Sequence, residues 1–306
     1  MNFRAYEDLL RDLEKWEKEL PEFDAVCGVP RSGLLAASYL ATRRNIRLVS
    51  IDKLVGAESP ESAIINAPLR DNNPLVRFRR PIGNRLLIVD DTSSKESVTM
   101  RLIRSQLADC KDLEITYGAV YQESEESAVD VYYETVAKPR LFEWNWQRHS
   151  MLQRAMFDMD GVLCEDWTAR QEMDDDPEFL DHVCNAKPLF LPAYPIRAIT
   201  TSRIERYRAE TVAWLAKHKV KYQVLNMHPA ATPEARRAAR DHSYRKAQHY
   251  IKDSDSSTKG SQLFVESDSK QARAISGLAR GKPVLCTDNM VMYLDGKMHL
   301  SDRSCD

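Results

Sequence analysis

Carboxylates stand directly after apolar runs at two places in this chain. The first run ends in Asp90 and Asp91, and the second ends in Asp158 and Asp160, which are separated by one residue. Ligands of open parallel sheets bind at the carboxyl ends of the strands. Carboxylates at such an edge can hold Mg²⁺, accept hydrogen bonds from sugar hydroxyls or attack a phosphorus atom. Both places therefore point to chemistry on phosphate compounds.

A loop suited to binding a phosphate accompanies the first acid pair. The segment Gly28–Gly33 follows a short apolar run and precedes a helical segment. Glycines let the backbone approach a phosphate closely, and a helix N-terminus presents unpaired N–H groups. Arg31 adds a guanidinium fork for phosphate oxygens. On its own the loop is equally consistent with a structural turn, because turns containing Gly and Pro often precede helices.

Helix capping is the alternative to a ligand-binding role at the first acid pair. Asp91 or Thr92 could accept hydrogen bonds from the first N–H groups of a helix that follows. A cap would not require Asp90, so the paired acids favour contact with ribose hydroxyls and with a magnesium-bound pyrophosphate.

The elements that must position these residues alternate between strands and helices. In the first half we expect strands at 25–27, 46–51, 85–89 and 115–121 and helices at 34–42 and 98–107. In the second half we expect strands at 155–157, 196–200, 222–225, 263–265 and 283–286 and helices at 207–218, 233–252 and 271–278. This alternation predicts an α/β protein with two doubly wound, mainly parallel sheets.

Two further segments do not belong to this alternation. Residues 1–20 are predicted to form an amphipathic helix whose apolar face contains Phe3, Tyr6, Leu9, Leu10, Leu13 and Trp16. The stretch 55–84 contains several prolines and reads as a long irregular loop. Loops of this length are usually functional lids or disordered.

The bulk composition narrows the class of protein. A length of 306 residues predicts two domains, at about 1–150 and 151–306. The net charge of -2 argues against a nucleic-acid partner. The sequence has no apolar leader and no run that could span a membrane, so we expect a cytoplasmic protein without a membrane partner. None of the six cysteines forms a CxxC pair, which argues against a zinc site or a disulfide framework.

The first half resembles the type I phosphoribosyltransferases, in which a glycine loop and an acid pair come in the same order and spacing. The resemblance implies that Gly28, Arg31, Ser32 and Gly33 bind the pyrophosphate of phosphoribosyl pyrophosphate (PRPP), and that Asp90 and Asp91 meet the ribose. It also implies a cradle for the 5-phosphate formed by Thr92, Ser93, Ser94, Lys95, Ser97 and Thr99. The family usually has glycines in this cradle, and Lys95-Glu96-Ser97 replaces them here.

Aromatic residues end this half of the chain. Leu141–Trp146 resembles a segment that ends some purine phosphoribosyltransferases, which implies an acceptor site at Phe142 and Trp144. Aromatic packing between domains is the alternative.

The second half resembles the haloacid-dehalogenase (HAD) superfamily of phosphatases. Asp158-x-Asp160-Gly-Val matches the first motif of that superfamily. The resemblance implies that Asp158 is the nucleophile and Asp160 the general acid and base. It also implies that the Asp158 side chain and the Asp160 backbone carbonyl bind Mg²⁺.

The later HAD motifs follow in order. Thr201-Ser202-Arg203 resembles the second motif, in which Thr201 would bind the transferred phosphoryl group. Lys246 is our candidate for the third motif, with Lys252 and Lys259 as rivals. Leu263–Asp268 resembles the fourth motif, in which Glu266 or Asp268 would complete the Mg²⁺ site. The insertions between the motifs are short, which implies a Rossmann-like domain with a minimal cap.

Together the two resemblances cover nearly the whole chain and imply consecutive steps, as in dual-domain ribosyltransferase/phosphatase proteins. PRPP would donate 5-phosphoribose to a glycan or a nucleobase, and the phosphatase would then remove the 5-phosphate. The expected partners are PRPP, this acceptor and a second copy of the chain in a homodimer, and the expected cofactor is Mg²⁺. The alternative is a regulatory module that senses PRPP or nucleotides, fused to a small-molecule phosphatase.

Overall fold

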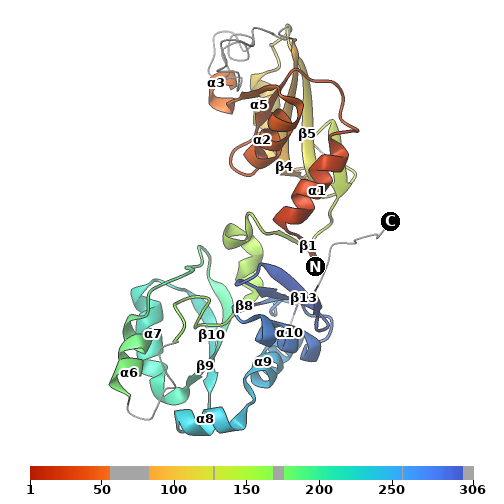
Figure 1. The fold of residues 1–306 in the computed structure, drawn as a ribbon. Helices are drawn as coiled ribbons and strands as arrows, with labels where there is room; N and C mark the ends of the chain where they lie inside the picture. Colours follow the sequence, from red (N-terminus) through yellow and green to blue (C-terminus); the bar gives the residue numbers. More distant parts are fainter. Residues whose placement is uncertain (56–82, 127, 168–175, 257, 299–306) are drawn as a thin grey trace, which may run out of the picture. The chain divides into compact units, whose positions relative to one another are not determined.

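The structure is a computed structural model that describes residues 1–55, 83–126, 128–167, 176–256 and 258–298. Most of the loop expected at 55–84 lies outside the described residues. The chain divides into two compact units, Met1–Trp144 and Asn145–Asp306 (Figure 1). No helix in the described part of the chain is long and apolar enough to cross a membrane.

The first unit is built on a five-stranded parallel sheet in the order β3-β2-β4-β5-β6. Its strands are β2 (Ala25–Gly28), β3 (Arg47–Val49), β4 (Arg85–Ser93), β5 (Glu114–Gln122) and β6 (Val131–Thr135). Its helices are α1 (Tyr6–Trp16), α2 (Gly33–Arg44), α3 (Ile51–Val55) and α5 (Val98–Gln106). The chain adds β3 on one side of β2 and β4 on the other, so the order switches between β2 and β4. A switch point of this kind opens a crevice at the carboxyl ends of the strands.

Helices cover both faces of this sheet. Leu13 and Trp16 of α1 and Leu40 of α2 share one core cluster with Leu87 and Val89 of β4. On the other face, Met100 and Ile103 of α5 pack with Leu86 and Ile88. Alternate residues of β4 therefore enter opposite cores, as the period of a strand requires.

The N-terminal segment differs from the predicted helix. Residues Asn2–Arg4 form β1, which pairs in parallel with β7 (Arg140–Phe142), and only then does α1 begin. Phe3 is buried through this pairing, whereas Tyr6 and Leu10 are 43% and 52% exposed. The buried face of α1 consists of Leu9, Leu13 and Trp16 together with Asp8 and Asp12.

The second unit contains a seven-stranded sheet in the order β10-β9-β8-β11-β12-β13-β14. Pairing is parallel from β10 to β12 and antiparallel in the final hairpin. The strands are β8 (Ala155–Phe157), β9 (Ile196–Ile204), β10 (Tyr222–His228), β11 (Leu263–Glu266), β12 (Val284–Cys286), β13 (Val291–Leu294) and β14 (Lys297–Met298). The order switches between β8 and β11, which is the second crevice that this chain can offer to a ligand.

Helices and short 3-10 turns connect these strands. The helices are α6 (Pro177–Asn185), α7 (Arg208–Lys217), α8 (Pro233–Ala239), α9 (His242–Ser256) and α10 (Ser269–Leu278). The 3-10 turns are η1 (Trp146–Arg148), η2 (Ser150–Arg154) and η3 (Glu205–Tyr207). The prediction of an α/β protein with parallel sheets is confirmed.

Three predicted boundaries are wrong in an informative way. The strand expected to end at residue 89 continues to Ser93, because Thr92 and Ser93 pair with Tyr121 and Gln122 of β5. The strand expected to end at residue 200 continues to Ile204, which pairs with His228 of β10. The single helix expected at 233–252 is two helices, separated where Arg240 adopts a left-handed backbone.

We predict that Leu13→Ala lowers the unfolding free energy of the first unit by about 2–5 kcal/mol, because Leu13 is fully buried. Leu10→Ala on the same helix is the matched control, and it should change the unfolding free energy by less than about 0.5 kcal/mol. Urea denaturation of the full chain followed by circular dichroism measures both. Equal losses for the two variants would contradict the observed orientation of α1.

Candidate functional site

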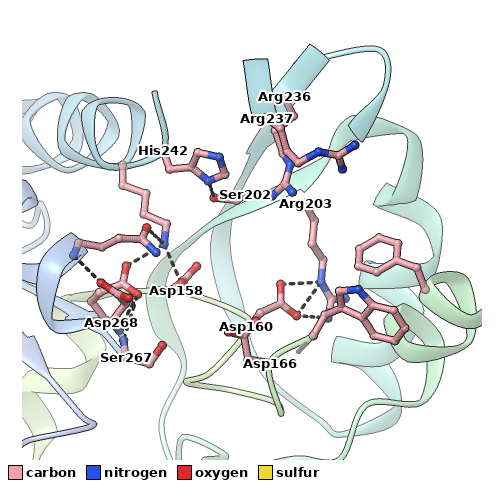
Figure 2. A pocket seen from close by; sticks show the side chains of 15 residues that line it. Asp158, Asp160, Asp166, Ser202, Arg203, Arg236, Arg237, His242, Ser267 and Asp268 are labelled. Carbon is pink, nitrogen blue, oxygen red and sulfur yellow. Dashed lines mark hydrogen bonds and ion pairs between the residues drawn. The ribbon is translucent and has the colours of Figure 1, made fainter. Parts of the chain in front are cut away.

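A cavity of about 320 Å³ opens in the second unit where the strand order switches. Acidic side chains from β8, β11 and the segments after them lie on one side, and arginines from β9 and α8 lie on the other (Figure 2). The side chains that line it include Asp158, Asp160, Asp166, Ser202, Arg203, Arg236, Arg237, His242, Lys246, Glu266, Ser267, Asp268 and Gln271. The cavity therefore gathers five acids and four permanent cations.

Lys246 bridges two buried carboxylates in this cavity. Its Nζ donates to Asp158 Oδ2 and to Glu266 Oε2, both at 2.7 Å, and to Gln271 Oε1 at 3.1 Å. Burial would lower the pKa of Lys246, but the two carboxylates raise it well above its ordinary value. Burial and then Glu266 raise the pKa of Asp158, against the attraction of Lys246. Of the three lysines proposed for this role, Lys252 and Lys259 are exposed.

Asp160 is held by Arg203. The Arg203 guanidinium contacts both carboxylate oxygens, with Nε at 3.1 and 2.9 Å and Nη2 at 2.5 Å from Oδ1. Burial alone would raise the pKa of Asp160, but Arg203 and His182 hold it well below its usual range. Asp160 is therefore ionised and ready to accept a proton, and donating one first requires its protonation.

The backbone after β8 brings these two acids to the crevice. The Asp158 N–H donates to Val265 O of β11 at 2.9 Å, which continues the pairing of the two strands. Gly161 has a φ of +80°, and a Cβ there would lie 2.3 Å from Ser267 Oγ. Glycine is therefore required at the turn that follows Asp160.

The sequence predicts that the Thr201 hydroxyl of β9 faces a phosphate, but Thr201 is not among the residues that line the cavity. Thr201 is 5% exposed, and its Oγ1 accepts a hydrogen bond from the Arg203 N–H at 3.1 Å. Among the described residues that line the cavity, the hydroxyl of β9 is that of Ser202. Its Oγ lies 2.8 Å from His242 Nδ1 (Figure 2).

The two acids of the fourth motif have different surroundings. Glu266 is fully buried, and its Oε1 accepts the N–H groups of Ser267 and Asp268 at 3.0 and 3.3 Å. Asp268 is exposed and caps α10 by accepting the Gln271 N–H at 2.7 Å. Both line the cavity, so either one can offer an oxygen to a ligand.

The donor set suits Mg²⁺ in its chemistry. Carboxylates and a backbone carbonyl are the hard oxygen ligands that Mg²⁺ prefers. Asp158, Glu266 and Asp268 face one cavity, and crowding of buried negative charge raises the pKa of Asp158, which a divalent cation would relieve. Within the described residues, however, no three His, Cys, Asp or Glu side chains are already clustered as a metal site. Lys246 occupies the space between two of the acids.

The first unit brings the glycine loop to Asp90. A Cβ at Gly33 would lie 2.7 Å from Val89 O and 3.0 Å from Asp90 Oδ1. Gly28 is equally confined, because a Cβ there would lie 2.8 Å from Ala37 Cβ. The loop between them includes a cis peptide bond from Pro30 to Arg31. Arg31 is exposed, and Ser32 is half-buried.

The structure separates the two acids of β4. Trp144 donates its Nε1–H to Asp91 Oδ2 at 2.6 Å, and its ring packs on Tyr121, Phe142 and Tyr6. Asp90 Oδ1 instead accepts the N–H of Asp91 at 2.8 Å. The two acids follow each other inside a strand, so their side chains point to opposite faces. Of the pair, Asp90 is the acid that meets the glycine loop.

The expected phosphate cradle is only partly assembled. Thr92 and Ser93 belong to β4, and Ser93 is buried. Ser94 and Ser97 form a tight turn, since the Ser97 N–H donates to Ser94 O at 3.0 Å, and Ser97 and Thr99 stand at the start of α5. Lys95 is exposed and pairs with Glu126. The Ser97 side chain does not cap the N–H groups of α5, and Lys95 directs its charge to Glu126.

Several side chains of these sites had no clear signal in the sequence. Ser202 and Arg203 lie in the segment that resembles the second HAD motif, but the resemblance points to Thr201 as the residue that binds the phosphoryl group. His242 lies in a helical segment with no motif, and its neighbour in space is 40 residues away in the chain. The bond from Trp144 to Asp91 spans 53 residues.

Comparison with solved structures finds similarities that cover less than half of the chain. No model of a known protein family matches the sequence, and no curated protein matches it. Xanthine-guanine-hypoxanthine phosphoribosyltransferase of Helicobacter pylori is 14% identical over 47% of this chain and 92% of its own, with a TM-score of 0.33. A purine phosphoribosyltransferase of Pyrococcus horikoshii is 18% identical over 47% and 92%, with a TM-score of 0.32. Orotate phosphoribosyltransferase of Aeropyrum pernix is 18% identical over 42% and 70%, with a TM-score of 0.30. Scores this low identify no activity, and these similarities give no support to a phosphatase domain.

We predict that Lys246→Met lowers the unfolding free energy of the second unit by about 3–5 kcal/mol at pH 8, because two buried carboxylates lose their common cation. The loss should shrink as the pH falls to 5, because burial and then Glu266 raise the pKa of Asp158, and protonation of Asp158 removes part of the uncompensated charge. Lys252→Met, at an exposed position, is the control and should stay within about 0.5 kcal/mol. A loss that is the same at both pH values would contradict the assigned charge pairing.

We predict that Asp90→Asn stabilises the first unit, and more strongly at pH 8 than at pH 5. Burial and then Asp91 raise the pKa of Asp90 to about 9. The folded state therefore keeps a proton that the unfolded state loses above its own lower pKa, and Asp90 reduces stability as the pH rises between the two values, by up to about 1.4 kcal/mol per pH unit. Denaturation of Asp90→Asn at the two pH values measures the effect. Asp109→Asn, which replaces an exposed acid, is the control.

Proposed function

We propose that this chain is a two-site enzyme for phosphoribosyl compounds. The first unit transfers 5-phosphoribose from PRPP to an acceptor, and the second removes the 5-phosphate of the product. One observation carries the proposal: each unit places acids and cations or N–H donors at the switch point of a parallel sheet, where ligands of such sheets bind. The phosphoribosyltransferase resemblance and the HAD resemblance both concern the 5-phosphate of a ribosyl group. Consecutive steps are therefore the simplest account of their presence in one chain.

In the second unit, Asp158 is the nucleophile. One of its oxygens attacks phosphorus, the bond from phosphorus to the ribose oxygen breaks, and a water molecule later hydrolyses the acyl phosphate. Lys246 holds the Asp158 carboxylate by a bond of 2.7 Å and offsets charge as the phosphate approaches. Mg²⁺ bound by Asp158, the Asp160 carbonyl and Glu266 or Asp268 would supply further charge neutralisation.

Asp160 suits the second half of this reaction. Its ionised carboxylate can take a proton from the attacking water, and Arg203 keeps it ionised. The leaving ribose oxygen also takes up a proton, and Asp160 can supply it only in a molecule in which Asp160 is protonated when the substrate binds. The pair with Arg203 thus favours the role of base in the resting enzyme.

In the first unit, Asp90 accepts hydrogen bonds from the ribose hydroxyls of PRPP, and the Gly28–Gly33 loop receives the pyrophosphate. The hydroxyls and N–H groups between Ser94 and Thr99 meet the 5-phosphate. Trp144 is half-buried and would line the acceptor side, where Asp91 fixes its indole. Phe142, which the sequence also suggested for this role, is 2% exposed and can only pack behind Trp144. A flat aromatic surface suits the face of a sugar or of a nucleobase.

A regulatory module that senses PRPP or nucleotides is the second candidate for the first unit. It is favoured by two contacts that occupy charged groups of the expected site, the ion pair of Lys95 with Glu126 and the bond of Trp144 to Asp91. Such a unit would bind PRPP and release no pyrophosphate.

We predict reciprocal losses in two variants that are given PRPP, Mg²⁺ and a library of glycans and nucleobases. Asp158→Asn should lower phosphate release by about 10³-fold or more, because an amide cannot form the acyl phosphate, while pyrophosphate release persists and a 5-phosphoribosylated product accumulates. Asp90→Asn should abolish pyrophosphate release and spare hydrolysis of ribose 5-phosphate. Mass spectrometry of the products measures both.

Two results would contradict the proposal, one from the wild-type protein and one from Asp158→Asn. PRPP binding without pyrophosphate release for any acceptor would favour the sensing module. Undiminished hydrolysis of ribose 5-phosphate by Asp158→Asn would remove the proposed nucleophile, and with it the phosphatase step.

A further inference from the structure

The cavity of the second unit contains a pair of side chains with no role so far, Ser202 and His242. We infer that Ser202, rather than Thr201, donates the hydroxyl hydrogen bond to the phosphoryl group, and that His242 is the positioning residue that aims it. This inference rests on the proposed phosphatase function of the same cavity.

The two hydroxyl residues that precede Ser202 in β9 are not among the residues that line the cavity. Thr201 Oγ1 accepts the Arg203 N–H at 3.1 Å, and Thr200 Oγ1 accepts the Asn226 Nδ2–H at 3.0 Å. Both residues are at least 95% buried. Ser202 instead lines the cavity together with Asp158 and Lys246. It is therefore the hydroxyl of β9 that a phosphate beside Asp158 can reach.

The hydrogen-bond chemistry fixes the direction of the Ser202–His242 contact. A phosphoryl oxygen only accepts hydrogen bonds, and a hydroxyl has a single hydrogen to donate. When Ser202 donates to the phosphate, its oxygen must be the acceptor from His242, whose Nδ1 lies 2.8 Å away. His242 must then carry its proton on Nδ1.

The surroundings of His242 agree with a neutral ring. Burial, followed by Arg236 and Lys246, lowers the pKa of His242 to about 4, against the opposite effect of Asp241. The ring centroid of His228 lies 6.2 Å from that of His242. The His228 ring accepts the Ala230 N–H at Nδ1 and contacts Asp241 through Nε2. A neutral imidazole has one donor nitrogen, so the contact with Ser202 selects the tautomer.

Two nearly isosteric substitutions separate this role from a structural one. Asparagine at position 242 can still donate from the place of Nδ1, whereas aspartate can only accept there and would turn the Ser202 hydrogen away from the phosphate. His242→Asn should thus keep inhibition by orthovanadate within about threefold of wild type, while His242→Asp and Ser202→Ala should each weaken it about 10- to 100-fold. The values of kcat and KM for ribose 5-phosphate are measured in parallel.

A double variant tests whether the two residues act together. If His242 acts through Ser202, adding His242→Asp to Ser202→Ala should cause little further loss of vanadate inhibition. Losses that multiply, or a His242→Asn variant as weak as His242→Asp, would overturn the positioning role. A Thr201→Val variant that loses inhibition while Ser202→Ala keeps it would overturn the assignment of the hydroxyl.

The failure of the underlying function has its own signature. A wild-type protein that neither hydrolyses ribose 5-phosphate nor binds vanadate would overturn the phosphatase function and this inference together. Hydrolysis that persists unchanged in Ser202→Ala and His242→Asp, yet is lost in Asp158→Asn, would overturn this inference alone. Thermal unfolding of each variant shows whether its fold is intact.

Discussion

Compensation of buried negative charge is the constraint on which the site of the second unit depends. Asp158 and Glu266 are buried together, and an ionised carboxylate without a partner would cost several kcal/mol in such a place. Lys246 contacts both of them, and Arg203 does the same for Asp160. Because these cations offset buried negative charge, their positions in the cavity are fixed by contacts within the chain.

The first unit also buries a pair of carboxylates, Asp90 and Asp91, but no cation contacts either of them in the described part of the chain. Asp91 receives a neutral donor from Trp144, and Asp90 lies between the glycine loop and its own strand. Burial, and then the charge of the adjacent Asp91, raise the pKa of Asp90. A ligand that brings positive charge close to Asp90 would relieve the cost of ionising it.

The positions of the strands that are buried on both faces could be predicted from the sequence. Strand β8 occupies the predicted residues 155–157, and the alternation of strands and helices correctly predicted parallel sheets. Buried parallel strands read as apolar runs, which makes their cores easy to find. Their ends are harder, because β4 and β9 continue through polar residues whose pairing partners lie on β5 and β10. The local sequence does not predict that pairing, because the partner residues are distant in the chain.

These strand extensions decide which residue of each polar motif faces the crevice. Side chains alternate along a strand, so continuing it by a few residues assigns neighbours such as Asp90 and Asp91, or Thr201 and Ser202, to different surroundings. A motif in the sequence points to a segment, but it does not determine which of its side chains face the crevice. That orientation is set by long-range contacts, of Asp91 with Trp144 and of Ser202 with His242. The chemistry of both crevices therefore depends on strand pairing as much as on the motifs themselves.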